Sequence, residues 1–389
     1  MPMSQIFRVA LVLGVLAATP AHAASQKLLK ISFSSSIMNS PATSSLFTNF
    51  AASDPGASTD NAVLKAVVPV QAGNCQTFKD VLIDTGSAIL WVGGENAYEP
   101  GANTRALNQT FSIGYGTGGA SGIAYLDKVT IGAATVNSQI IGSANETTAF
   151  TLVRPIDGIL GLGPPGSNYG EVSGFNTTPT FVENLVSEGT IDEAMFGIYV
   201  NGLDASDGTE IGQGEITFGG IDESKIRGEM VWLPQNEPYN YRWSFNVSSL
   251  SFGNLSLVND TEPGRTDTGV LGLGIPFDSY FVILHATPGA SIVPNGTFIG
   301  YLAFPTNVST STLPPLTFGL GDQTFDIPAS QYLIPKGLYD SLGLNASAAV
   351  YSWISSAGTG SFMFGQKWLE GVYTGYDLTG HRVGFAHLA

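Results

Sequence analysis

The segment Ile83-Asp84-Thr85-Gly86-Ser87-Ala88-Ile89-Leu90-Trp91-Val92 contains an Asp-Thr-Gly triplet between apolar residues. The triplet recurs at residues 267–269, within Arg265-Thr266-Asp267-Thr268-Gly269-Val270. About 75 to 100 residues after each triplet, two apolar residues precede a Gly, as Ile159-Leu160-Gly161 and as Met363-Phe364-Gly365. A duplication with so long a period predicts two similar lobes rather than a short-repeat solenoid.

Each triplet is expected to place its carboxylate at the tip of a turn, because a strand that ends in Asp-Thr-Gly bends sharply at the Gly. If two such turns meet between two lobes, their carboxyls come within hydrogen-bond distance and share one proton across the acidic range. The neutral carboxyl can then donate to a substrate carbonyl while the ionised one accepts a proton from water. A single triplet is ordinary turn chemistry, so its repetition is what predicts Asp84 and Asp267 as an acid–base pair. Such a pair needs no metal and no cofactor.

The composition predicts an all-β protein. The chain of 389 residues contains 48 Gly and 21 Pro, and its apolar runs are short and rich in Val, Ile, Thr and Phe. Its length fits two domains, and its 43% of hydrophobic residues can bury a large core. In the first half the only convincing helix is predicted over residues 180–188, where Phe181, Leu185 and Val186 share one face after Pro179.

The chain is strongly acidic, with 31 acidic against 15 basic residues and a formal net charge of −16. Such a surface repels nucleic acid and anionic membranes, so neither is expected as a partner. The excess of carboxyls suits a protein that works at low pH, where protonation relieves their repulsion. The alternative, that this is the ordinary acidity of many extracellular proteins, stays open.

The N-terminus carries a targeting signal. Arg8 precedes an apolar stretch over residues 9–18, and Ala21 and Ala23 form a small-x-small cleavage pattern, so residues 1–23 are expected to be a signal peptide. The stretch is shorter than the roughly 20 residues that a membrane-spanning helix needs. Residues 24–60 are expected to form a pro-segment with a strand near residues 28–33, and the protein is expected to be secreted, to the extracellular space or to a vacuole. Nine glycosylation sequons agree with this route: Asn108, Asn145, Asn176, Asn246, Asn254, Asn259, Asn295, Asn307 and Asn345.

Other hydrolytic chemistries find little support in the sequence. Cys75 is the only cysteine, so no intrachain disulfide is possible, and with no neighbouring His to activate it we expect a spectator thiol. No Gly-x-Ser-x-Gly motif occurs that His285, His381 or His387 could serve in a serine hydrolase. No His-Glu-x-x-His motif of a zinc protease is present either.

Several motifs, in order along the chain, carry a resemblance to a known family. They are residues 83–92 around the first triplet, a flap-like Ser112-Ile113-Gly114-Tyr115-Gly116-Thr117-Gly118, Asp157-Gly158-Ile159-Leu160-Gly161-Leu162-Gly163, Thr217-Phe218-Gly219-Gly220-Ile221-Asp222, and a closing run from Phe364 to Ala386. Over residues 62–389 the chain resembles the pepsin-like aspartic proteases, most strongly the cysteine-poor, polyporopepsin-like fungal secreted enzymes.

The resemblance implies a role for each candidate residue. Thr85 and Thr268 would clasp the two turns by mutual hydrogen bonds, and Ser87 would bond the outer oxygen of Asp84. Tyr115 would close over the substrate and, with Trp91, wall the S1 pocket. Backbone groups of an extended peptide would pair with four residues of the flap and the turns. These are Gly86, Gly116, Thr117 and Gly269.

The second triplet departs from the family pattern. Val270 stands where a hydroxyl is expected, so Asp267 loses a donor to its ionised form, and its pKa should rise. Arg265 stands where an apolar residue is usual, two residues before Asp267 and therefore on the same strand face. The matching family position lines the S1′ pocket, so Arg265 is expected either to favour an acidic P1′ residue or to lower the pKa of Asp267. The alternative, that Arg265 extends into solvent, stays open.

The resemblance implies a bilobal fold of two pseudo-symmetric, β-barrel-like lobes with a cleft between them. The N-terminal lobe is expected over residues 61–200 and the C-terminal lobe over residues 201–389. The implied activity is that of an endopeptidase acting at acid pH on peptide or protein substrates, as a monomer. The alternative is a protein of the same fold that binds peptides or acts as an inhibitor without cleaving.

Overall fold

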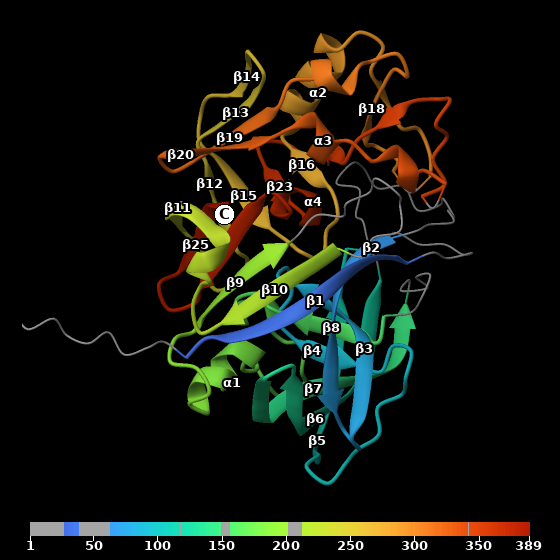
Figure 1. Ribbon diagram of the computed structural model, residues 1–389. Coiled ribbons are helices and arrows are strands. Elements are labelled where there is room, and N and C mark those ends of the chain that lie inside the picture. Colours follow the sequence, from blue (N-terminus) through green and yellow to red (C-terminus); the bar gives the residue numbers. More distant parts are fainter. Residues whose placement is uncertain are drawn as a thin grey trace, which may run out of the picture.

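The computed structural model describes residues 27–38, 63–116, 118–148, 156–200, 212–296, 298–340 and 342–389. The expected signal peptide, most of the expected pro-segment and Thr117 lie outside these residues. Within the described residues the protein is mostly β, which confirms the predicted fold class (Figure 1). The predicted lobe limits stay a prediction, because the residues 201–211 that follow the expected boundary are not among those described.

The largest sheet takes strands from both halves of the chain, in the order β11-β25-β24-β9-β10-β1-β2-β3-β8-β4-β7-β6-β5. Its strands are β1 (Leu29–Met38), β2 (Val63–Ala72), β3 (Gln76–Asp84), β4 (Leu90–Val92), β5 (Arg105–Gly114), β6 (Gly119–Ile131), β7 (Ala134–Thr148), β8 (Gly158–Gly161), β9 (Met195–Val200), β10 (Gly212–Phe218), β11 (Ile226–Pro234), β24 (Val372–Asp377) and β25 (Arg382–Leu388). In Figure 1 the first half of the chain lies below and the second half above, and β9, β10 and β1 run between them.

Three smaller sheets belong to the second half. The first orders β12 (Ser244–Val247), β15 (Glu262–Thr266), β23 (Phe362–Phe364), β16 (Leu273–Ile275) and β22 (Ile354–Ser356). The second orders β14 (Leu255–Val258), β13 (Ser249–Phe252), β19 (Leu316–Leu320) and β20 (Gln323–Ile327). The third orders β17 (Ser291–Ile292), β18 (Leu302–Phe304) and β21 (Val350–Tyr351).

Helices are short and cover the sheets. They are α1 (Phe181–Ser187), α2 (Phe277–Ala286), α3 (Ala329–Tyr332) and α4 (Gln366–Leu369), with 3₁₀ turns η1 (Pro165–Asn168), η2 (Glu223–Lys225), η3 (Thr310–Thr312) and η4 (Lys336–Leu338). The helix predicted over residues 180–188 is confirmed as α1, and Thr180 and Glu183 close its N-terminus in a capping box. Among the described helices, none combines the length and the apolar character needed to cross a membrane.

The duplication predicted from the two triplets is present in the strand pairings. In the first half β3 pairs parallel with β8, β8 antiparallel with β4, and β4 parallel with β7. In the second half β15, β23, β16 and β22 repeat this order and these directions. The Gly that ends each repeated motif allows close packing beneath the turn. A Cβ atom on Gly161 would lie 2.6 Å from the Ile89 nitrogen, and one on Gly365 would lie 2.2 Å from the Gly272 oxygen.

Strand β1 comes from the region expected to be a pro-segment, and it lies in the sheet between β10 and β2. The strand predicted near residues 28–33 is therefore present, although it continues to Met38. Lys30 of β1 forms an ion pair with Asp222, which follows β10, and a second with Glu215 at 3.9 Å.

Candidate active site

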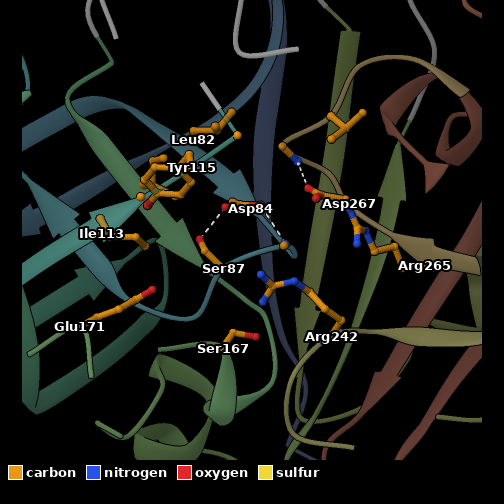
Figure 2. A pocket seen from close by; sticks show the side chains of 16 residues that line it. Leu82, Asp84, Ser87, Ile113, Tyr115, Ser167, Glu171, Arg242, Arg265 and Asp267 are labelled. Carbon is orange, nitrogen blue, oxygen red and sulfur yellow. Dashed lines mark hydrogen bonds between the residues drawn. The ribbon is translucent and has the colours of Figure 1, made fainter. Parts of the chain in front are cut away.

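The two Asp-Thr-Gly turns meet face to face between the halves of the chain. Asp84 ends β3 and Asp267 directly follows β15. A Cβ atom on Gly86 would lie 2.5 Å from Oδ2 of Asp267, and one on Gly269 would lie 2.8 Å from Oδ1 of Asp84. Each Gly thus lies against the carboxyl of the opposite turn, and the two carboxyls are close enough for the negative charge of Asp84 to raise the pKa of Asp267. Figure 2 shows them at the centre of one cavity.

The two threonines lock the turns together below the carboxyls. The Thr85 amide donates to Oγ1 of Thr268 at 2.9 Å, and the Thr268 amide donates to Oγ1 of Thr85 at 3.0 Å. The Thr268 hydroxyl in turn donates to the Ile83 carbonyl at 2.8 Å. Both threonines are buried, so these bonds are shielded from water and fix the relative position of the two turns. A further buried bond, from Trp243 Nε1 to the Leu162 carbonyl at 2.8 Å, joins the halves nearby.

The two carboxyls receive different numbers of hydrogen bonds. Asp84 accepts one from the Gly86 amide at 2.8 Å and another from the Ser87 hydroxyl. Asp267 accepts one from the Gly269 amide at 3.0 Å, and Val270 has no hydroxyl to repeat the part of Ser87. Because bonds donated to a carboxylate favour its ionised form, Asp84 is the better-stabilised anion of the pair.

Burial sets the charge of the pair. It raises the pKa of Asp267 to about 8, helped by the negative charge of Asp84 and opposed by the positive charge of Arg265. Burial also raises the pKa of Asp84, but the hydrogen bonds from Ser87 and Gly86 oppose this rise. Burial and mutual repulsion thus favour a pair that holds one proton, and the additional hydrogen bond to Asp84 favours Asp267 as the protonated member.

The flap-like residues cover this cavity from the β5–β6 hairpin. The Tyr115 amide donates to the Gly118 carbonyl at 2.8 Å and closes the hairpin turn. Trp91 is fully buried, and its Nε1 donates to the Tyr115 hydroxyl at 2.8 Å. The cavity measures about 260 Å³. Its walls include Asp84, Asp267, Gly86, Ser87, Gly269, Tyr115, Gly116 and Arg265. The predicted site residues are thus gathered in one place, except for Thr117, which lies outside the described residues, and for Trp91, Thr85 and Thr268, which support the walls.

Arg265 lies beside Asp267, partly buried, at the wall of the cavity rather than extended into solvent (Figure 2). Two further residues of this cavity have ionisable side chains and were not predicted from the sequence, namely Arg242 and Glu171. Arg242 precedes a strand whose alternate residues are buried, so the alternation could have shown that it faces outward. Only the packing of the two halves shows that this outward face borders the cavity.

Glu171 is a third carboxyl at the wall of the cavity. Burial raises its pKa to about 8, a shift opposed by Arg242 and assisted by Asp84. Its buried Oε2 atom has no hydrogen-bond partner among the described residues. Glu171 is therefore neutral at acid pH. Within the described residues, no three His, Cys, Asp or Glu side chains gather as a metal would require.

Replacing Glu171 with Gln is expected to stabilise the protein near neutral pH and to have no such effect at acid pH. The folded pKa of about 8 lies above the ordinary value of 4.5. Below pH 4.5 Glu171 is protonated in both the folded and the unfolded state and does not affect stability. Between pH 4.5 and pH 8 it ionises in the unfolded state first, which lowers the free energy of unfolding progressively. Gln carries no such cost, and the gain should reach roughly 1–3 kcal/mol in the free energy of unfolding. Denaturant unfolding of both proteins at pH 4 and pH 7.5 checks this, with the exposed Glu229→Gln as control. An equal difference at both pH values would contradict it.

Comparison with known proteins gives a consistent assignment. Residues 67–388 match the family model "Eukaryotic aspartyl protease". The chain is 32% identical to polyporopepsin of Irpex lacteus over 335 residues, which cover 84% of this chain and 95% of that protein. It is 30% identical to gastricsin of Mus musculus over 328 residues, with 79% and 76% covered. Among solved structures, the aspartic proteinase from Irpex lacteus superposes with a TM-score of 0.75 at 30% identity, covering 93% of this chain and 98% of that one. The resemblance seen in the sequence is confirmed, and the chain belongs to the eukaryotic aspartyl protease family, as a pepsin-like aspartic endopeptidase.

Proposed function

We propose that this protein is a secreted endopeptidase that hydrolyses internal peptide bonds at acid pH with Asp84, Asp267 and a water molecule. The observation that carries the proposal is the pair of opposed carboxyls in one cavity, with unequal hydrogen bonding. The expected partners are peptide or protein substrates. We expect the enzyme to act as a monomer, outside the cell or in a vacuole.

The unequal environments assign the roles. The protonated Asp267 donates a hydrogen bond to the oxygen of the scissile carbonyl. The ionised Asp84 accepts a proton from the water molecule while the water oxygen adds to the carbonyl carbon. The tetrahedral adduct then breaks its C–N bond, and the amine leaves with the proton that Asp84 took up. The amide donors of Gly86 and Gly269 keep both carboxyls oriented throughout.

The substrate would lie as an extended strand between the turns and the β5–β6 hairpin. Gly86 and Gly269 border the cavity without side chains, and Gly116 is exposed at the hairpin tip. These positions leave room for backbone pairing with a peptide, which is a form of strand addition. Closure of Tyr115 over the bound peptide would exclude water from the reacting bond.

The test is digestion of a peptide library by the secreted protein across pH 2–8, with and without pepstatin. We expect cleavage inside the peptides, inhibited by pepstatin, with activity lost as the pH rises and Asp267 gives up its proton. On the acid side activity should fall when Asp84 also becomes protonated, because no base then remains. Val270 motivates the alternative of a protein that binds without cleaving, and peptides bound but left intact at every pH would favour it.

A further inference from the structure

A second cavity of about 320 Å³ opens beside the carboxyl pair, on the side of the second half of the chain. Arg242 and Arg265 line both this cavity and the one around the two carboxyls, so the two spaces adjoin at the arginines. The remaining wall is largely apolar and includes Pro263, Phe362 and Met363. We call this space the two-arginine pocket.

The fold places both arginines in the pocket wall. Arg265 pairs across β12 and β15 with Ser244 and across β15 and β23 with Met363. Arg242 lies two residues before Ser244, next to the ring of Tyr241, whose centroid is 4.2 Å from the guanidinium carbon. Its Nη1 donates to the Tyr241 carbonyl at 2.9 Å. The two guanidinium groups thus come from β15 and from the segment just before its neighbour β12 (Figure 2).

The pocket wall is positively charged. Among the described residues that line the pocket, Arg242 and Arg265 are the only ones with a charged side chain. The carboxyl pair, which holds one negative charge when it carries one proton, lies in the adjoining cavity. Glu171, whose raised pKa keeps it neutral at acid pH, adds no negative charge there. Arg242 forms no ion pair with any residue that the structure describes. Burial and the charge of Arg242 also lower the pKa of Arg265, so an anion between the two guanidinium groups would relieve their repulsion.

We propose that the two-arginine pocket binds an acidic side chain of the substrate, at the P1′ position directly after the cleaved bond, so that the enzyme prefers Glu there. This inference rests on the proposed function. Arginine binds carboxylates through paired hydrogen bonds, and Pro263, Phe362 and Met363 can cover the methylene groups of a Glu side chain. The pocket adjoins the carboxyl cavity through Arg265 and is lined only by the second half of the chain, whereas Tyr115, the expected S1 wall, belongs to the first half. We therefore assign the pocket to the other side of the cleaved bond, which is P1′.

The preference should depend on pH. The guanidinium groups stay charged at every pH of interest, whereas an unperturbed Glu side chain has a pKa of about 4.3. A substrate Glu is therefore mostly neutral at pH 3 and mostly ionised at pH 5.5. The selectivity for Glu over its neutral isostere Gln is thus expected to be small at pH 3 and to grow toward pH 5.5.

The experiment uses two peptides that differ only in Glu or Gln at P1′. For the wild-type enzyme the ratio of kcat/KM for Glu over Gln should be roughly 10-fold or more at pH 5.5, as expected for hydrogen bonds to a charged group, and near one at pH 3. Arg242→Gln and Arg265→Leu should each lower the ratio at pH 5.5, and the double variant should bring it to one. The exposed Arg227→Gln, on β11 and away from the cleft, should leave it unchanged.

A charge-reversed variant guards against loss of folding. Arg242→Glu should make a P1′ Lys peptide a better substrate than the Glu peptide, which mere destabilisation would not do. Two results would overturn this inference but leave the proposed function intact. In one, the wild-type enzyme cleaves the Gln peptide as well as the Glu peptide at pH 5.5. In the other, it prefers the Glu peptide, but both arginine variants keep that preference. If wild-type enzyme cleaves neither peptide nor any library member, the proposed function fails instead.

Discussion

Asp84→Asn is expected to lower kcat by about 10³-fold or more, and Asp267→Asn by at least about 100-fold. Asp84 accepts hydrogen bonds from Ser87 and Gly86 and is the ionised member, so its replacement removes the only base that can take a proton from water. Asn at position 267 still offers an N–H donor to the substrate carbonyl, but it cannot exchange a proton with the rest of the site. The losses therefore differ, and they are measured as kcat for one cleaved peptide near the pH optimum.

The variants should be tested for folding as well as for activity. Without the charge of Asp84, the pKa of Asp267 should fall, because that charge is one of the causes that raise it. Asp84→Asn should accordingly lose less stability than wild type as the pH rises toward 8. The exposed Asp322→Asn, in the turn between β19 and β20, serves as the matched control and should keep full activity. Substantial peptide cleavage by Asp84→Asn would contradict the assignment of the base.

The sequence was most informative where a local motif specifies a local geometry. Asp-Thr-Gly bends a strand and places a carboxyl at the turn, and its repetition at residues 84–86 and 267–269 predicted the duplication that the strand pairings contain. The helix after Pro179 was predictable because Phe181, Leu185 and Val186 share one face directly after a Pro that can begin a helix, and the structure adds a capping box of Thr180 and Glu183. In each of these signals, the residues that carry the information lie within a few positions of one another along the chain.

The residues that sequence reasoning missed depend on contacts between distant segments. Glu171 lies in the loop between β8 and α1, where an acidic residue is ordinary. It becomes unusual only because the fold buries its side chain in the same cavity as Asp84. Arg242 could not be assigned to the site from the sequence for the same reason. Nothing in the local pattern shows that the pairing of β12 with β15 brings it beside Arg265. The continuation of β1 to Met38 likewise depends on its two neighbouring strands, β10 and β2, rather than on its own Ser-rich sequence.

Gly86→Ala is expected to lower kcat by roughly 100-fold with little change in the overall fold. The added methyl group would lie 2.5 Å from Oδ2 and 2.7 Å from Cγ of Asp267, so either the Asp267 carboxyl or the first turn must shift. Such a shift separates the carboxyls, and a misplacement of about 1 Å at a reacting group can cost about 10²-fold in rate. The hydrogen bonds between Thr85 and Thr268 hold the turns below, so the strain falls on the carboxyls themselves.

The matched control is Gly371→Ala, which does not line the cavity and where the methyl group would lie 2.6 Å from Nε2 of Gln331. The end of the Gln331 side chain must then shift, at the cost of its hydrogen bond to the Lys367 carbonyl, but no carboxyl of the site is displaced. Single-turnover and steady-state cleavage of one peptide, together with the unfolding transition, separate a catalytic from a structural effect. If the carboxyls separate, Gly86→Ala should also lose its activity at a lower pH than the wild-type enzyme as the pH rises. Asp267 would then lose the repulsion from Asp84 that raises its pKa. If Gly86→Ala keeps both the kcat and the pH profile of the wild-type enzyme, the added methyl group fits between the two turns without moving the Asp267 carboxyl. The opposed geometry on which the mechanism depends would then be wrong.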